Sequence, residues 1–402
     1  MRVLFLYPYA PGSVASFVRP ANIIKRLLDN GIEVTLAAVG HLNLAPTDIN
    51  LSLREFSYLK RVPGVRLMAE KGAVFHNALI VNRLIKTHDL VHVQKCHPTA
   101  SLPAVFASIM NHKPVHYDWD DNETEILKCA TPPYKRPYSQ IGEFALVERR
   151  LVRLVDTISV ASMRLKTLAL MYGAAPDRLF DAPVGADLSH FHPGKPEKKE
   201  IDALGVKPPM VLYQGQLEEF SFAEEFVQCA AMVRAEIPDA QFMVIGGGSK
   251  LENLRRLADD QGTHIDFTGY IPHQRVADYV RAADVCVATF PDNELTRCKS
   301  PLKIAEYLAA GKAIVASDMG DVRRMVSEAG LLVGPGDVRS LADNIIKLLR
   351  EPGLRASLGE MARKRSEQEF NWERTTSNIV SAYDKALALR QTRRRSGRRL
   401  IP

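Results

Sequence analysis

Short runs of apolar, β-branched residues alternate with amphipathic helical segments along most of the chain. Several of these runs are apolar almost throughout, which is typical of parallel strands that are buried on both faces. In the first half the predicted strands are 3–7, 33–39, 90–93, 114–118 and 157–161. In the second half they are 210–215, 241–246, 265–269, 284–290, 313–317 and 331–333. Strands that alternate with helices predict right-handed βαβ units and an α/β architecture.

The pattern starts again near residue 208, after a stretch between His192 and Glu200 that is rich in proline and charge. We interpret this stretch as a linker between two doubly wound, Rossmann-like domains. Ligands bind such sheets at the carboxyl ends of the strands, so we expect the domains to face a central cleft. The predicted parts are an N-terminal domain (1–190), the linker (191–207), a C-terminal domain (208–370), a final helix that could pack back on the first domain (371–389) and a basic tail (390–402).

Composition excludes several classes of protein. A chain of 402 residues is longer than one typical domain, and no apolar run of about 18 residues predicts a membrane span. The apolar start at Met1–Tyr7 is too short for a signal peptide and is followed by Pro8. The five cysteines have no metal-ligand spacing, which predicts reduced thiols, no zinc and a cytoplasmic protein.

The net charge is +7, and much of the positive charge lies in the arginine-rich tail between Arg390 and Arg399. Such a cluster predicts an anionic partner, and no nucleic-acid-binding module precedes it. We therefore expect no nucleic acid and a protein that can lie on the inner face of the membrane. The alternative is a disordered, solubilising tail.

The segment from Arg297 to Ser317 carries the strongest functional signal. Ser300 followed by Pro301 predicts a helix start, with serine as the N-cap, and Gly311 predicts its end. The preceding predicted strand would aim this helix N-terminus at the cleft, where free N–H groups and the helix dipole suit a phosphate.

Lys303, in the first turn, adds a full positive charge, and Glu306 follows on the same face of the helix. A carboxylate at this place could accept hydrogen bonds from ribose hydroxyls. The alternative is an ordinary, well-capped helix with surface charges.

A second signal is the acidic stretch that follows the predicted strand 114–118, with Asp118, Asp120, Asp121 and Glu123 within six residues. A carboxylate at the cleft could orient an acceptor hydroxyl or act as a base. One alternative is a divalent-cation site of the kind found in glycosyltransferases of the GT-A fold. The other is a solvated, capped loop, since Asp and Asn favour such positions.

His97 also follows a strand, and Arg19 opens the first helical region near a glycine loop. Both could face the cleft and contact a substrate, although a lone histidine before proline is more often structural.

The residues from Glu306 to Val315 resemble the C-terminal donor motif of glycosyltransferase family 4 and its relatives of the GT-B fold. Further motifs occur in the same order and extend the resemblance over residues 208–350. These are 211–217, 238–248, 265–270 and 282–285. The first half resembles the family more loosely, through 1–12, 31–35 and 181–191.

The resemblance implies a hexosyltransferase of GT-B fold that transfers a sugar from a nucleotide sugar with retention, without metal or another cofactor. The donor residues that it implies are Gly12, Gln216, Gly247, Tyr270, Ile271, Ser300, Leu302, Lys303 and Glu306. The first domain would bind the acceptor through Arg19, His97 and Asp118, and the implied catalytic residues are Asp120, Asp121 and Lys303. Asp120 stands where many members have a histidine.

The sequence also departs from the family pattern. Eight residues before Glu306, where many members have a glutamate, stands Cys298, and Glu294 lies in a different register. An arginine and a lysine that are common in the first loop of the C-terminal domain are replaced by Gln216 and Ser221.

A diphosphate leaving group needs cationic stabilisation. We therefore assign this role to Lys303, with Arg297 and Lys299 as further candidates. The Ser-Pro-Leu-Lys sequence resembles an exopolysaccharide sub-branch and suggests a lipid-linked or cell-surface saccharide as acceptor. The departures also leave open a non-catalytic nucleotide-sugar-binding protein, and the fold leaves open a nucleotide-sugar epimerase.

Overall fold

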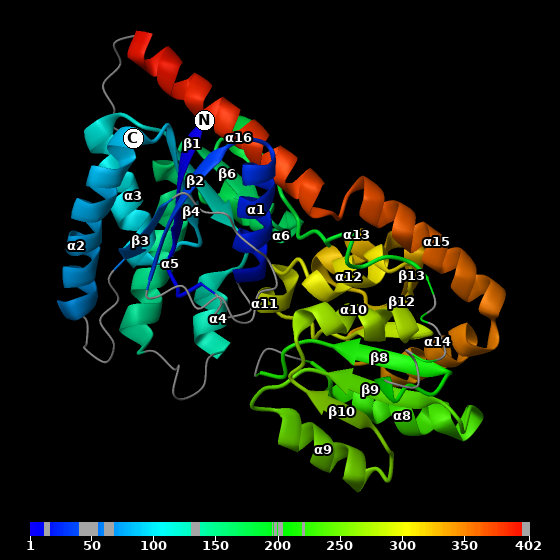
Figure 1. The fold of residues 1–402 in the computed structure, drawn as a ribbon. Coiled ribbons are helices and arrows are strands. Elements are labelled where there is room, and N and C mark those ends of the chain that lie inside the picture. The colour runs from blue at the N-terminus through cyan, green and yellow to red at the C-terminus, as the bar shows by residue number, and fades with distance from the viewer. Residues whose placement is uncertain are drawn as a thin grey trace. The chain divides into compact units, whose positions relative to one another are not determined.

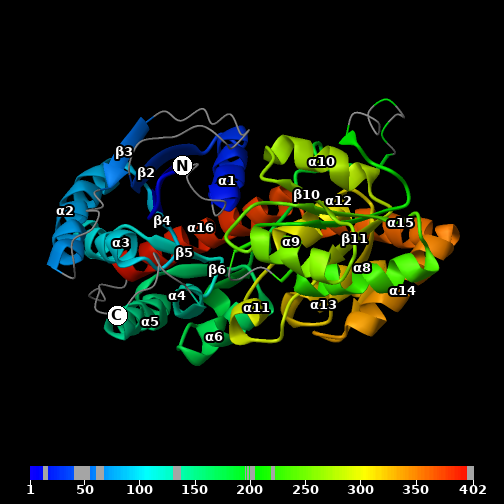
Figure 2. The same cartoon turned by 90° about the horizontal axis from the view of Figure 1, so that it is seen from below.

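The structure is a computed structural model that describes residues 1–11, 17–39, 55–59, 68–129, 137–194, 196, 199, 204–218 and 222–395. The chain forms two units, of which the first contains Met1–Pro183 and Trp372–Pro402 and the second Val184–Asn371. Each unit is built on one parallel sheet flanked by helices (Figures 1 and 2). Among the described residues, no helix combines the length and the apolar character needed to cross a membrane.

The first unit has a seven-stranded parallel sheet in the order β3-β2-β1-β4-β5-β6-β7. The strands are β1 (Arg2–Tyr7), β2 (Glu33–Val39), β3 (Glu55–Leu59), β4 (Leu90–Gln94), β5 (Val115–Trp119), β6 (Thr157–Val160) and β7 (Leu179–Asp181). The chain runs outward from β1 in one direction and from β4 in the other. The carboxyl ends of these two neighbours therefore form a switch point, where ligands bind in open α/β sheets.

Among the described residues, seven α-helices accompany this sheet: α1 (Val18–Asp29), α2 (Met68–Leu84), α3 (Pro98–Asn111), α4 (Glu123–Cys129), α5 (Tyr138–Leu154), α6 (Met163–Met171) and α16 (Trp372–Arg395). The last helix, α16, is drawn in orange to red in Figure 1. Its Ile379, Tyr383 and Ala386 are buried in one core with residues of α1, β1 and β2. The end of the chain thus completes the first unit.

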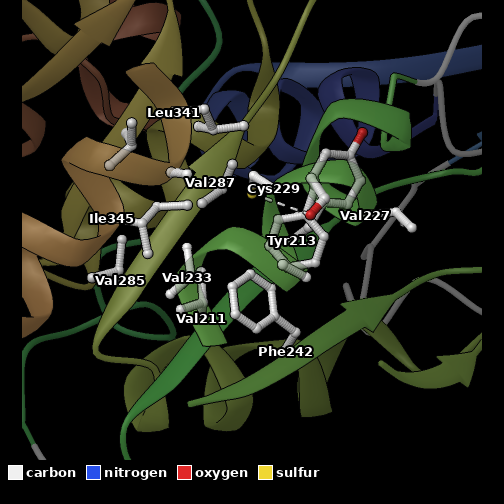
Figure 3. Packing of buried hydrophobic residues seen from close by; sticks show 14 of the residues in the cluster. Val211, Tyr213, Val227, Cys229, Val233, Phe242, Val285, Val287, Leu341 and Ile345 are labelled. Carbon is white, nitrogen blue, oxygen red and sulfur yellow. Dashed lines mark hydrogen bonds between the residues drawn. The ribbon is translucent and has the colours of Figure 1, made fainter. Parts of the chain in front are cut away.

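The second unit has a six-stranded parallel sheet in the order β10-β9-β8-β11-β12-β13. The strands are β8 (Met210–Gln214), β9 (Gln241–Ile245), β10 (Asp266–Gly269), β11 (Val285–Ala288), β12 (Ala313–Ser317) and β13 (Gly330–Val333). The helices are α8 (Glu224–Glu236), α9 (Leu251–Asp260), α10 (His273–Ala282), α11 (Glu294–Arg297), α12 (Leu302–Ala309), α13 (Gly320–Val326), α14 (Val338–Arg350) and α15 (Pro352–Gln368). Figure 3 shows Val285 and Val287 of β11 packed near Leu341 and Ile345 of α14.

The structure confirms the predicted α/β fold with two doubly wound sheets. All eleven predicted strands are present, with ends that differ from the prediction by two residues at most. The short strands β3 and β7 were not predicted. Both lie at the edges of the first sheet.

The boundary between the units differs from the predicted limits of 1–190 and 208. Residues 184–194 already belong to the second unit. Phe191 is 1% exposed, its carbonyl accepts a hydrogen bond from Arg363, and Ala186 donates its N–H to Phe370. Apolar burial and backbone pairing therefore override the linker-like composition.

The predicted end of the last helix at residue 389 is wrong, because α16 continues to Arg395. Arg390 is 8% exposed and forms a buried ion pair with Asp156. It also donates a hydrogen bond of 2.9 Å to Ser108 of α3. Arg390 is thus part of the folded unit and not of a tail.

Candidate functional site

In the second unit, the first turn of α12 lies beside the loop that follows β8. Lys303 places its Nζ 3.9 Å from the centre of the Tyr213 ring and 5.6 Å from that of Phe290. Gly215 has φ +150°, and a Cβ there would come within 2.8 Å of this Nζ. The loop therefore needs glycine both for its backbone and to leave room for the ammonium.

Lys303 is half-buried, and the partial removal of its ammonium from solvent disfavours the charged form. Burial lowers the pKa of Lys303 to about 7, and the nearby Lys299 lowers it further, while Glu306 opposes the shift. An anionic ligand at this ammonium would favour the protonated form. The residue is thus suited to respond to a phosphate.

The loop after β9 packs backbone against backbone on the loop after β8. A Cβ on Gly246, which has φ +142°, would overlap the carbonyl oxygen of Gly215. The N–H of Leu217 donates to the carbonyl oxygen of Gly247 at 3.0 Å. Gly247 is thus a structural part of this double loop, and Gln216 is exposed at its surface.

Glu306 is held by two side chains that the sequence analysis did not single out. Gln214, the last residue of β8, donates to its Oε2 at 2.6 Å. His273, the first residue of α10, lies with Nε2 2.6 Å from its Oε1. Glu306 itself is 4% exposed, whereas the side chain of His273 is 40% exposed. His273 is therefore the accessible member of the trio.

Tyr270 and Ile271 precede α10 on the loop that also leads to His273. Tyr270 is 66% exposed, and Ile271 is half-buried. An exposed aromatic ring on the loop that leads to His273 is compatible with the predicted contact to a nucleoside.

Ser300 is not the N-cap of α12, so this prediction is wrong. The helix begins at Leu302, and Pro301 before it is extended. Ser300 lies one residue too far back, and its Oγ accepts the N–H of Val184 at 3.1 Å. Among the described residues α12 has no side-chain cap. Its first N–H groups, next to the half-buried Leu302, are thus left for a ligand or water.

Arg297 and Lys299, the further candidates for stabilising a leaving diphosphate, differ in their surroundings. Arg297 is exposed and engaged by the carboxylate of Asp292 at 2.7 and 2.9 Å. Lys299 is half-buried beside Lys303. Cys298, at the position where a glutamate is common, is completely buried, with Sγ 3.9 Å from Glu294 Oε1.

In the first unit, Arg19 and Asp118 form a closed pair. Arg19 donates to both carboxylate oxygens of Asp118 at 2.7 and 2.8 Å, and Ser159 adds a third bond at 2.5 Å. Burial alone would raise the pKa of Asp118, but Arg19 holds it below its usual range. Both residues are buried. This placement supports a structural role and does not expose Asp118 to an acceptor.

The carboxylates of Asp120, Asp121 and Glu123 converge on one buried ammonium. Lys95 Nζ lies 3.2 Å from Asp120, 3.2 Å from Asp121 and 2.7 Å from Glu123. The three carboxylates bring oxygens within 4.8 Å of one another, as a cation site would require. In this structure the ammonium contacts all three, so a metal would have to displace it. Independence from metal remains a prediction.

Asp120 and Asp121 differ in access and in basicity. The side chain of Asp121 is 27% exposed and that of Asp120 8%. Burial and the neighbouring Asp121 raise the pKa of Asp120 to about 6, although Lys95 lowers it. A carboxylate with this pKa is suited to accept a proton near neutral pH.

His97 caps the helix that follows β4. Its Nδ1 accepts the N–H of Thr99 at 3.4 Å and lies 2.9 Å from the Thr99 hydroxyl. Its ring meets the edges of Tyr9 and Phe144. This geometry gives His97 a structural function at the start of α3. Gly12 lies outside the described residues.

Lys95, Gln214 and His273 are the candidate residues that sequence reasoning missed. Lys95 and Gln214 stand at or just after the ends of β4 and β8, where ligands bind α/β sheets. That position is a signal which could have found them. His273 carries no such signal, because its partner Glu306 is 33 residues away.

Residues 208–351 match the model of a family described as Glycosyl transferases group 1. Among curated proteins, the chain is similar to a GDP-mannose-dependent monoacylated alpha-(1-6)-phosphatidylinositol monomannoside mannosyltransferase of Corynebacterium glutamicum. The two are 28% identical over 233 residues, or 56% of this chain. A D-inositol 3-phosphate glycosyltransferase of Xylanimonas cellulosilytica is 31% identical over 263 residues, or 61% of this chain. The matched part of the chain spans 61% of the length of each of these two relatives.

A phosphatidyl-myo-inositol mannosyltransferase of Mycolicibacterium smegmatis aligns over 96% of this chain and 94% of its own length, with 24% identity. Solved structures match over nearly the whole chain. Sucrose-phosphate synthase from Thermosynechococcus elongatus has a TM-score of 0.73 at 19% identity and covers 96% of this chain and 99% of its own. Anabaena Alr3699/HepE in complex with UDP and glucose has a TM-score of 0.74 at 17% identity, with the same two coverages. At these identities the likeness establishes the fold, which is GT-B.

Proposed function

We propose that this chain of GT-B fold is a glycosyltransferase that moves a sugar from a nucleotide sugar to an acceptor hydroxyl with retention. The match of residues 208–351 to the Glycosyl transferases group 1 model supports this proposal. One observation carries the proposal. At the carboxyl edge of the second sheet, the ammonium of Lys303 lies over a glycine loop, and one turn later Glu306 is held by Gln214 and His273. A cation and a fixed carboxylate suit the diphosphate and the ribose of one ligand.

The chemistry follows from these groups. As the bond between the anomeric carbon and the phosphate oxygen breaks, the bond electrons pass to the diphosphate. Lys303 and the free N–H groups of α12 stabilise this added negative charge. The acceptor oxygen bonds to the same face of the anomeric carbon, and its proton passes to a base. The departing phosphate and the carboxylates of Asp120 and Asp121 are the bases that we propose.

For the acceptor we propose a lipid-linked or cell-surface saccharide. Relatives named for phosphatidylinositol monomannoside and phosphatidyl-myo-inositol support an acceptor that is carried by a lipid.

A surface of the first unit supports the same idea. Six large apolar side chains are exposed on two packed helices, namely Phe75 and Leu79 on α2 and Leu102, Phe106, Ile109 and Met110 on α3. We call this set the α2–α3 face. The sequences 72–88 and 98–113 contain no Asp or Glu but contain Arg83, Lys86 and Lys113.

The helix that carries the basic residues is bonded to α3, because Arg390 donates a hydrogen bond to Ser108 of that helix. Apolar side chains next to basic residues suit the surface of an anionic bilayer, and two weak signals together give stable attachment. We propose that the α2–α3 face and the arginine-rich end contact such a bilayer.

The enzyme hypothesis is tested first by binding and then by turnover. A thermal-shift screen over UDP-, GDP- and ADP-sugars should find one donor that raises the Tm, since a ligand of the native state stabilises it. Product formation from this donor, with NMR of the anomeric configuration, then tests retention. Lys303→Met and Glu306→Gln should lower turnover strongly, whereas the exposed Lys364→Met on α15 should not.

The other outcomes identify the alternatives. A donor that binds without transfer or slow hydrolysis would make the chain a nucleotide-sugar-binding protein. Conversion of the donor to its epimer without any acceptor would make it an epimerase. An inverted product would contradict the retaining mechanism, and normal turnover of both variants would place the donor elsewhere.

A further inference from the structure

Lys95 is a buried lysine that the proposed transfer does not use directly. It directly follows β4, and its side chain is 2% exposed. Its nitrogen meets carboxylates from three different residues at 2.7–3.2 Å. An isolated buried ammonium is very costly, so its place is determined by these three partners.

The backbone of Lys95 is also unusual. Its φ is +67°, a left-handed conformation that is unfavourable for a residue with a Cβ. In this conformation its N–H donates to the carbonyl oxygen of Asp118, the neighbour in β5, at 3.2 Å. A strained residue at the end of a central strand is typical of a functional position.

The acidic loop is held from its other side as well. Glu148 of α5 accepts hydrogen bonds from the Trp119 indole, from the Glu123 N–H and from the Thr124 hydroxyl. Tyr9 donates to Glu123 Oε2 at 3.2 Å. These contacts fix the loop backbone and Glu123. For Asp120 and Asp121, Lys95 supplies the shared positive charge.

The charges around Lys95 do not balance. Three carboxylates face one ammonium, and Arg19, which also acts on Asp120 electrostatically, is itself paired with Asp118. Three anionic oxygens within 4.8 Å repel one another unless a cation lies among them. Enzymes commonly place a divalent metal at such a point.

We propose that Lys95 is a positioning residue that acts as a tethered cation: its ammonium holds Asp120 and Asp121 together with Glu123 and presents them to the acceptor hydroxyl. The proposal rests on the proposed function, in which these two aspartates serve the acceptor. It explains how an acidic loop that resembles a metal site can work without a metal.

The first test measures cation binding and needs no activity. Lys95→Ala removes the ammonium and opens space among the three carboxylates. The variant should bind one Tb³⁺ per chain, with luminescence sensitised by Trp119, and Mn²⁺ should compete. The wild type and Lys128→Met, which removes an exposed lysine of α4, should show no such signal. Equal binding by the wild type would overturn the proposal.

The second test measures transfer as a function of pH, using Lys95→Met. Asp120 is faced by Lys95, Asp121, Arg19 and Asp118. Loss of the ammonium raises the pKa of Asp120, so the acid limb of kcat should move to higher pH by about one unit or more. At pH 6.5 a shift of one unit alone should lower kcat about threefold. Loss of the positioning of Asp120 should bring the total fall to roughly 100-fold, the lower end of what a positioned base contributes. Lys128→Met should keep the wild-type profile.

A charge-balanced variant serves as a control for misfolding. Lys95→Met/Glu123→Gln removes one positive and one negative charge, and it should show the same loss of kcat with a circular dichroism spectrum like that of the wild type. For Lys95→Ala, Mn²⁺ should restore part of the lost kcat, which a merely structural role would not do. An unchanged pH profile in both Lys95→Met and Lys95→Met/Glu123→Gln would refute the positioning role of Lys95.

The outcomes separate this inference from the proposed function. Asp120→Asn and Asp121→Asn report on the proposed function alone. If both keep full turnover, the aspartates do not serve the acceptor, whatever the Tb³⁺ result. If they lose turnover while Lys95→Met keeps it, the proposed function stands and the role of Lys95 falls.

Discussion

At the scale of single residues, the candidate donor site depends on one lysine with unusual surroundings. Lys303 lies over the Tyr213 ring with its pKa lowered to about 7, so near neutral pH about half of the unliganded molecules carry no charge there. A diphosphate would favour the protonated lysine. Binding is therefore coupled to uptake of a proton.

This coupling predicts a pH dependence of ligand affinity. Because only the protonated lysine attracts the diphosphate, the apparent Kd for UDP or GDP should rise about tenfold per pH unit above pH 7. Titration calorimetry in two buffers with different ionisation enthalpies would show proton uptake at pH 8. Lys303→Met should bind more weakly and lose this dependence. If the variant kept the same slope, another group would carry the effect.

The buried pair of Arg19 and Asp118 leads to a prediction about stability. Asp118→Asn leaves the guanidinium without its counter-ion, which should lower the free energy of unfolding by about 3–5 kcal/mol. The folded-state pKa of Asp118 is below that of the unfolded chain. Its stabilising effect is thus present above about pH 5 and is lost as the pH falls.

Urea unfolding between pH 3 and 7 would measure both effects. The control is Asp177→Asn, which removes an exposed carboxylate paired with Lys385 and should have little effect on the free energy of unfolding. A similar small cost for Asp118→Asn would show that the buried pair contributes little.

At the scale of elements, the sequence was sufficient where local pattern decides the outcome. The strand from Glu33 to Val39 has the predicted ends, and so does that from Ala313 to Ser317, because both are buried, β-branched runs between turns. The strand β7 was missed because it has only three half-buried residues at a sheet edge. Ser300 was misassigned because its true partner, Val184, is 116 residues away.

Local sequence pattern was likewise sufficient for only part of the candidate site. The sequence predicted Lys303, Glu306 and the acidic loop, since each belongs to a local motif. The neighbours that determine their chemistry come from other strands and helices, such as His273 beside Glu306 and Lys95 beside Asp121. Such pairs depend on the order of strands in the sheet, which no local pattern specifies.

The packing of α16 against the rest of the first unit gives a prediction at the scale of elements. Arg390→Met breaks the buried pair with Asp156, so the free energy of unfolding should fall by about 3 kcal/mol. Truncation after Arg395 keeps the buried arginine and should leave this free energy nearly unchanged. Chemical denaturation of both proteins would measure the two free energies of unfolding. A large loss on truncation together with little loss for Arg390→Met would show that the last seven residues, and not Arg390, secure the helix.

At the scale of the whole molecule, the net charge of +7 is only part of the case for an anionic surface. Electrostatic attraction weakens with salt, whereas burial of apolar side chains does not. The α2–α3 face and the arginine-rich end therefore make separable contributions. They can be changed independently, since Phe75 and Phe106 are exposed and a cut after Arg395 spares the buried Arg390.

Sedimentation with vesicles of phosphatidylglycerol and phosphatidylcholine would measure the contributions of the α2–α3 face and of the arginine-rich end separately. Truncation after Arg395 should weaken binding at low salt and reduce its salt dependence, while Phe75→Ser/Phe106→Ser should weaken binding that persists at 0.5 M salt. A protein with both changes should stay in the supernatant yet still gain Tm from the nucleotide donor, because the proposed donor residues Lys303 and Glu306 lie in the second unit. Tyr138→Ser, at another exposed aromatic residue of the first unit, is the matched control. Undiminished sedimentation of the combined variant would refute the proposed surface, and loss of donor binding would instead reveal a damaged fold.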